Sequence, residues 1–117
     1  MTTDDFEYQV ESVTAQFAFI RRIATLDKAD HAIKLRLYVD DECFVQVYTN
    51  IGKGLLSFTL IINRIRMYGR DCEGGAWHRH PYDAPKTHDF SAEGQRVVTL
   101  AQFLAEVQQI LQAEDIL

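Results

Sequence analysis

The sequence has few cysteines and prolines and no long apolar run. Among its 117 residues are two cysteines and two prolines, and Cys43 and Cys72 form no CxxC pair of the kind that indicates zinc binding or a redox motif. No segment approaches the roughly 18 apolar residues that a membrane span needs, and the opening residues are acidic and polar where a signal peptide is basic and then apolar. We therefore expect a cytoplasmic protein with no membrane association and no structural disulfide.

Internal repeats, low-complexity tracts and linkers rich in Pro, Gly or Ser are also missing. The composition, 47% hydrophobic and 25% charged, is that of an ordinary globular protein. A chain of this length buries roughly two-thirds of its unfolded surface, which is enough for a core without metal or disulfide links. We expect residues 1–117 to form a single domain.

Positive charge is scarce except in one segment. The net charge of −5 argues against a protein that coats nucleic acid in general. Residues 64–88, however, hold five of the twelve Lys and Arg side chains and three of the seventeen Asp and Glu side chains. This is the one part of the chain with a basic excess, and it also contains three of the four histidines.

Two hairpins are predicted in the middle of the chain. Apolar and polar residues alternate with a period of two over His31–Val39 and again over 43–48, and the Asp40-Asp41 pair separates them, so residues 31–50 indicate a hairpin. The apolar, β-branched segment Leu56–Arg70 indicates one long central strand. A Gly-rich turn at 71–75 then predicts an antiparallel return over Ala76–His80.

A helix is predicted at the C-terminal end. Thr99 and Gln102 have the spacing of a capping box, and apolar residues recur at helical spacing from Leu100 to near Ala113. Residues 8–25 fit either a helical face or a strand, and their β-branched and aromatic composition favours a strand.

These elements predict an α+β fold, an antiparallel meander of about five strands with the C-terminal helix packed on one face. One helix cannot cover both sides of the central strand, which carries Phe58, Leu60 and Ile62 on one side and Ile61, Ile65 and Met67 on the other. We therefore expect a homodimer or a heteromer.

The basic segment contains groups suited to RNA cleavage without a metal. One imidazole can take the proton of a 2′-hydroxyl, a second can protonate the leaving oxygen, and arginine stabilises the phosphorane. On a single strand over 58–70, one face would carry Arg64, Arg66, Tyr68 and Arg70. His78 and His80 of the returning strand would then lie within reach of these side chains. The predicted catalytic residues are His78, His80 and His88, and the predicted substrate-binding residues are Arg64, Arg66, Arg70, Arg79, Tyr68 and Tyr82.

Two other interpretations of this segment stay open. Alternating His and Arg side chains on an edge strand also serve simply to solvate it and to prevent edge-to-edge pairing. The His-x-His spacing directs two imidazoles to the same side, and His88, Asp83 or Asp89 would complete a metal site. The spacing to a third ligand is not diagnostic, however, and we expect no metal and no other cofactor.

The order of motifs resembles the TumE-like toxins of bacterial toxin–antitoxin pairs. The resemblance covers about four-fifths of the chain and rests on the hairpin IKLRLYVDDECFVQVYTN, the strand FTLIINRIRMYGRD, the loop WHRHPYDAPKTHDF and the final VVTLAQFLAEVQQIL. Within the loop, Tyr82-Asp83-Ala84-Pro85 and His88 follow the family's order, whereas His78 and His80 precede it. The resemblance implies a toxin that acts inside the cell and is held inactive by an antitoxin from a neighbouring gene.

The sequence therefore predicts a toxin-like protein that is a metal-independent ribonuclease acting on RNA, an activity inferred from the residues and not from the resemblance. The competing hypothesis is a non-enzymatic protein-binding or adaptor module with a surface-exposed His and Arg loop. A metal-dependent hydrolase is the third.

Overall fold

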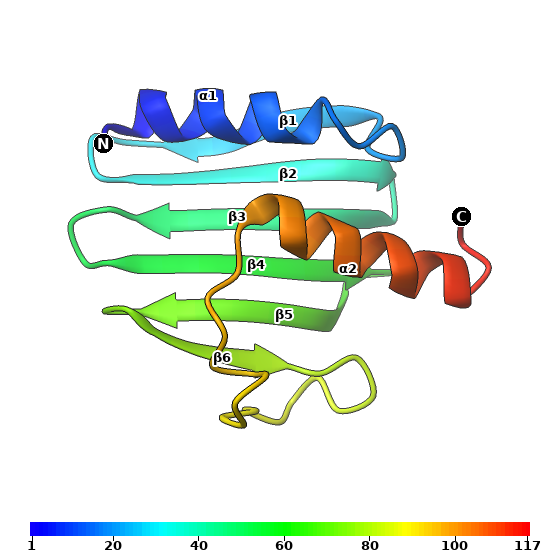
Figure 1. Ribbon diagram of the computed structural model, residues 1–117. Helices are drawn as coiled ribbons and strands as arrows, with labels where there is room; N and C mark the ends of the chain where they lie inside the picture. The colour runs from blue at the N-terminus through cyan, green and yellow to red at the C-terminus, as the bar shows by residue number, and fades with distance from the viewer.

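A computed structural model describes residues 1–117 and has two helices and six strands (Figure 1). Each strand pairs antiparallel with the next one along the chain, so the sheet order is β1-β2-β3-β4-β5-β6. The elements are α1 (Thr3–Thr14), β1 (Arg22–Lys28), β2 (Ala32–Asp40), β3 (Cys43–Asn50), β4 (Leu55–Ile62), β5 (Ile65–Glu73), β6 (Ala76–His80) and α2 (Leu100–Ala113). The predicted α+β meander is confirmed, with six strands in place of about five.

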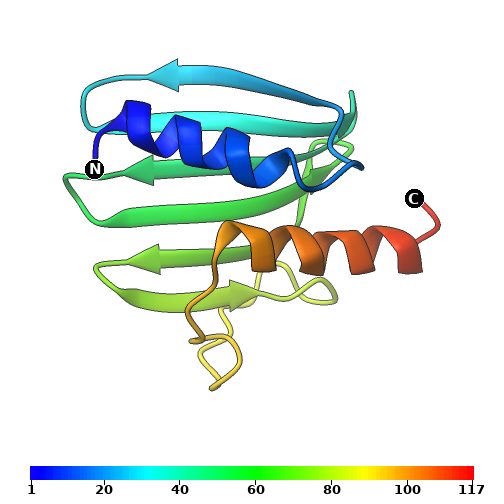
Figure 2. The ribbon, with the colours of Figure 1, turned by 45° about the horizontal axis from the view of Figure 1, so that its top comes forward.

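Both helices lie on the same face of the sheet, as the two views of Figures 1 and 2 agree. The core lies between this face and the helices, and Leu35, Val45, Leu60, Phe103 and Val107 in it have no exposed surface. The opposite face carries no helix, and we call it the helix-free face. Neither helix is long and apolar enough to cross a membrane.

The predicted hairpin and C-terminal helix are confirmed. Buried and half-buried residues alternate along β2, which pairs with β3 through a turn at Asp41 and Glu42. Thr99 Oγ1 accepts a hydrogen bond from the Gln102 amide (3.1 Å), and Gln102 Oε1 accepts one from the Thr99 amide (2.9 Å). This capping box starts α2 at the predicted residue, because it satisfies two amides that have no partner inside the helix.

The strand predicted over residues 8–25 is wrong in its first half. The chain is helical over Thr3–Thr14, and only Arg22–Lys28 is extended. A second capping box, between Thr2 and Asp5, starts α1, and Val10 is buried against the sheet. Local capping and burial of one apolar face thus outweigh the β-propensity of the residues at the end of α1.

The single strand predicted over Leu56–Arg70 is also wrong, because a tight turn divides it into β4 and β5. Asn63 and Arg64 have φ values of 51° and 68°, the left-handed backbone that a two-residue hairpin turn requires. Leu60 pairs with Tyr68 but Ile61 pairs with Arg66, so β5 contains a bulge at Met67. A bulge inserts one residue, so side chains before and after it no longer share a face in simple alternation.

The helix-free face is largely polar, which removes the basis for expecting a second subunit on it. Pairing places Ile65 opposite Ile62, at the turn, and Met67 packs against the core. Ile61 is the one residue of the predicted second apolar side that stays on the helix-free face, where it lines a depression among polar side chains. A homodimer or heteromer therefore stays a prediction.

Candidate functional site

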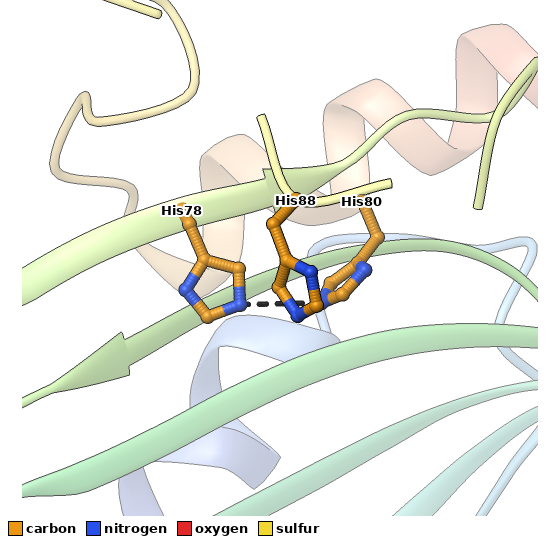
Figure 3. A group of neighbouring side chains, drawn as sticks. All are labelled: His78, His80 and His88. Atoms are coloured by element: carbon orange, nitrogen blue, oxygen red, sulfur yellow. Dashed lines mark hydrogen bonds between the residues drawn. The ribbon is translucent and has the colours of Figure 1, made fainter. Parts of the chain in front are cut away.

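Three histidines come together at the β6 end of the helix-free face. His78 and His80 are two residues apart on β6, and His88 comes from the long connection between β6 and α2 (Figure 3). The Nε2 atoms of His78 and His80 are 3.2 Å apart. One ring nitrogen from each of the three histidines lies within 4.8 Å of the other two.

The position of His88 follows from a short backbone pairing. Arg79 and Asp89 exchange two hydrogen bonds, Arg79 N to Asp89 O (3.2 Å) and Asp89 N to Arg79 O (2.8 Å). In this antiparallel register residue 88 lies beside residue 80, and residue 90 beside residue 78. The ring centroids are accordingly 4.7 Å apart for His80 and His88, and 5.5 Å apart for His78 and Phe90.

A carboxylate completes the cluster. Asp71 of β5 pairs with His78 in the β5–β6 ladder, and its Oδ2 lies 3.4 Å from His78 Nε2 and 3.2 Å from His80 Nε2. Its other oxygen, Oδ1, accepts a 2.6 Å hydrogen bond from Ser57 Oγ on β4. Ser57 therefore orients the carboxylate so that Oδ2 faces the imidazoles. We call His78, His80, His88 and Asp71 the histidine cluster.

His80 is the most enclosed member of the histidine cluster, with 4% of its surface exposed. Its Nδ1 lies 3.0 Å from the Pro85 carbonyl oxygen, which can only accept, so Nδ1 carries the proton and Nε2 presents a lone pair to the cluster. Burial lowers the pKa of His80, against the opposing effect of Asp71. Gly69, which pairs with His80 on β5, places no side chain against this ring.

A depression of about 570 Å³ on the helix-free face adjoins the histidine cluster. Its lining contains three cations and no carboxylate, and Ser57 of this lining donates a hydrogen bond to Asp71 of the histidine cluster. None of the three cations forms an ion pair. We call it the cationic depression, and its lining residues are Lys34, Gln46, Tyr48, Ser57, Thr59, Ile61, Arg64 and Arg66.

The predicted substrate-binding residues do not all meet there. Arg64 and Arg66 line the cationic depression, but Arg70 lies on the helix-covered face and has no exposed surface. Its guanidinium donates to both carboxylate oxygens of Glu106 (3.1 and 2.8 Å) and to the carbonyl and carboxylate oxygens of Glu93 (2.8 and 2.9 Å). The prediction that Arg64, Arg66 and Arg70 share a face is wrong, because the turn and the bulge separate them.

The other three predicted residues also lie away from the histidine cluster. Arg79 and Tyr82 line a groove beside α2, and Arg79 is bound to Asp89 (2.7 Å). Tyr68 is buried and stacks on Phe103, with ring centroids 5.6 Å apart. These positions make Arg79 and Tyr68 structural residues, the first tying the β6–α2 connection to β6 and the second filling the core.

Sequence reasoning missed Asp71, Ser57 and Lys34. The sequence predicts Asp71 in a Gly-rich turn over 71–75, whereas β5 continues through Glu73 and only Gly74 and Gly75 have the positive φ of a turn. The signal that would have found it is Asn63, a residue that favours left-handed backbone in two-residue turns. With a turn at Asn63 the next strand extends through Asp71, which then lies across from His78.

Comparison of the chain with family models, with curated proteins and with solved structures gives no match. The resemblance to TumE-like toxins therefore stays a prediction from the sequence motifs.

Proposed function

We propose that this chain is the toxin of a toxin–antitoxin module and that it binds and cleaves RNA on the helix-free face. The observation that carries the proposal is the contact between two unlike sites: a depression with three unpaired cations borders a cluster of three imidazoles and a carboxylate. In a chain with a net charge of −5, unpaired cations gathered on one face favour an anionic ligand.

Phosphates are the natural ligands of the cationic depression. Arg64 and Arg66 offer planar donor groups that match phosphate oxygens, and Lys34 adds a point charge. Tyr48 in the same lining offers an aromatic ring on which an unpaired base can stack. This combination of cations and an aromatic ring suits single-stranded RNA better than a small anion.

The histidine cluster supplies the chemistry at the border of this binding surface. One imidazole accepts the proton of the ribose 2′-hydroxyl, the 2′-oxygen attacks phosphorus, and the bond to the 5′-oxygen breaks as that oxygen takes a proton from a second imidazole. The products are a 2′,3′-cyclic phosphate and a free 5′-hydroxyl, and Arg66 is placed to stabilise the added negative charge. If the cluster held a metal ion, His78, His80, His88 and Asp71 would be its ligands, and the ion would supply Lewis-acid stabilisation of the phosphate in place of acid–base catalysis by these imidazoles.

The toxin role is tested in cells. Induction of this chain alone should arrest growth, and co-expression of the neighbouring open reading frame, as the proposed antitoxin, should restore it. This outcome would also support action in the cytoplasm. Harmless expression of the folded protein would overturn the toxin proposal and favour the adaptor hypothesis.

The ribonuclease role is tested with purified protein and a single-stranded RNA oligonucleotide. We expect products that end in a 2′,3′-cyclic phosphate. Arg66→Ala should lower the cleavage rate at least about tenfold, the effect of losing one charge-assisted hydrogen bond to phosphate. Arg21→Ala is the matched control, because Arg21 is also exposed but lies outside the cationic depression.

Equal loss of activity in both arginine variants, or RNA that stays intact with the unmodified protein, would remove the ribonuclease assignment. Binding of RNA without cleavage would reduce the proposal to an RNA-binding protein.

A further inference from the structure

The donor atoms of the histidine cluster are those that borderline transition metals prefer. Imidazole nitrogens and a carboxylate oxygen are the common nitrogen and oxygen ligands of Zn²⁺ in proteins. Here three imidazoles present one nitrogen each within 4.8 Å of one another, and Asp71 Oδ2 faces two of those nitrogens. No lysine, arginine or backbone amide donates a hydrogen bond to these nitrogen and oxygen atoms.

The spacing of these atoms matches a metal coordination sphere. In a tetrahedral site with bonds of about 2.0–2.1 Å, neighbouring donor atoms lie about 3.3 Å apart. The three distances among His78 Nε2, His80 Nε2 and Asp71 Oδ2 are 3.2, 3.2 and 3.4 Å. These atoms therefore have the spacing of one face of such a tetrahedron, and His88 supplies a third imidazole nitrogen within 4.8 Å of the other two.

The hydrogen-bond pattern leaves two lone pairs facing each other. His80 Nδ1 carries the proton that it donates to the Pro85 carbonyl, so His80 Nε2 presents a lone pair. Asp71 Oδ2, 3.2 Å away, is also an acceptor. Two acceptors at this distance need a donor or a cation beside them; the His78 imidazole can donate from Nε2, 3.2 and 3.4 Å away, and a metal ion bound to all three atoms removes the repulsion equally well.

Three of the four ligands are also held by a neighbouring group, as in established metal sites. Ser57 Oγ donates to the outer oxygen of Asp71, and the Pro85 carbonyl accepts from the far nitrogen of His80. The backbone pairing of Arg79 with Asp89 holds His88 beside His80. The site is thus oriented before any ligand binds, which reduces the entropy that binding must overcome.

We propose that His78, His80, His88 and Asp71 bind one divalent transition-metal ion of the Zn²⁺ class at the edge of the helix-free face. This inference goes beyond the proposed function and does not depend on it, because the cluster geometry makes no use of RNA. It revises the sequence-based expectation that the chain binds no metal.

The test measures metal binding without RNA. Full-length protein is freed of metal with a chelator, dialysed and titrated with Zn²⁺, and the bound metal is counted by mass spectrometry. We expect one Zn²⁺ per chain and a rise in Tm on binding, because the ion binds the folded state preferentially. Co²⁺ in its place should give the intense visible absorption of a tetrahedral site.

Variants locate the site. His88→Ala should lower the Zn²⁺ affinity by more than about a hundredfold, and Ser57→Ala, which removes the group that orients Asp71, by about 10–100-fold. Both residues lie outside the buried core, so these variants keep the fold, which circular dichroism verifies. His31→Ala, the loss of an exposed histidine in the β1–β2 turn, is the matched control and should leave the affinity unchanged.

Absence of stoichiometric Zn²⁺ and Co²⁺ binding would overturn the inference and would mean that hydrogen bonds alone join the side chains of the histidine cluster. Equal losses of affinity in His31→Ala and His88→Ala would overturn it as well. Metal binding by a protein that leaves RNA intact would refute the ribonuclease proposal alone, whereas cleavage that survives complete metal removal would support that proposal and refute a metal in the reaction.

Discussion

Arg70 has a structural role in the molecule although it lies in the basic segment that suggested RNA binding. Its guanidinium has no exposed surface, and it is bound by Glu106 of α2 and by Glu93 of the β6–α2 connection. A buried guanidinium is tolerated only when its donors are satisfied. The residue therefore ties β5, α2 and the connection together and is not available to a substrate.

Glu93 makes this contact sensitive to acid. Hydrogen bonds from Arg96 and then from Arg70 lower the pKa of Glu93 from an ordinary value of 4.5 to about 2. Because the folded-state pKa lies below the unfolded one, the stabilisation is complete above about pH 4.5 and is lost as the pH falls toward 2. Glu93→Gln should therefore flatten the pH dependence of Tm in this range.

The check is a comparison of Tm for the unmodified protein and Glu93→Gln from pH 2 to pH 7. The difference between them should be largest at neutral pH and should shrink below pH 4.5. A difference that stays constant across the range would mean that the charge of Glu93 does not contribute.

At the scale of elements, the turn between β4 and β5 decides which basic residues reach the helix-free face. Arg64 has a φ of 68°, a backbone conformation that is unfavourable for a residue with a side chain. The same residue lines the cationic depression. Strain kept at a turn that also presents a functional side chain is a frequent compromise between stability and activity.

Replacement of this residue should separate the two effects. Arg64→Gly should raise the free energy of unfolding by up to about 1 kcal/mol, since glycine adopts positive φ without steric conflict. The same change should weaken RNA binding, because it removes one of three cations in the depression. Urea unfolding and RNA titration measure the two quantities, and a destabilised variant would contradict the assigned strain.

The β5 bulge at Met67 also decides which residues of β5 reach the helix-free face. The residues after it, Tyr68 and Arg70, turn to the helix-covered face, while Arg66 before it stays on the helix-free face with Ile61. A strand pattern with a period of two cannot reveal this inserted residue, because the bulge is set by the partner strand. The sequence therefore grouped four residues that the sheet divides.

At the scale of the whole molecule, the connection from β6 to α2 links the histidine cluster to the rest of the fold. Besides the backbone pairing, the Arg79 side chain donates from Nε and Nη2 to Asp89 Oδ2 (2.9 and 2.7 Å), and Arg70 binds Glu93 further along. These two arginines hold the connection against the sheet at two points. The position of His88 thus depends on residues that themselves lie outside the cluster.

Asp89→Ala tests this dependence. The change removes the side-chain link to Arg79 and leaves His78, His80 and Asp71 in place, so we expect the Zn²⁺ affinity to fall about tenfold, an effect typical of an outer group. Titration of the metal-free variant measures it, with Tm followed in parallel. An unchanged affinity would mean that the backbone pairing alone positions His88.

The sequence by itself determined the elements whose signals are local. Alternation over residues 31–50 predicted the first hairpin, the glycines at 74 and 75 predicted the second turn, and the Thr99–Gln102 capping box predicted the start of α2. In each case the residues that interact are neighbours in the chain. Local propensity and tertiary packing favour the same structure there.

Only the tertiary structure decided which groups meet at the histidine cluster. Ser57, Asp71, His80 and His88 come from three strands and a connection, and their contact depends on strand register, on a bulge and on one backbone pairing. A shift of one residue in any of these turns a side chain to the other face. Periodicity identified the histidines, but the cooperative pairing of the whole sheet determines their neighbours.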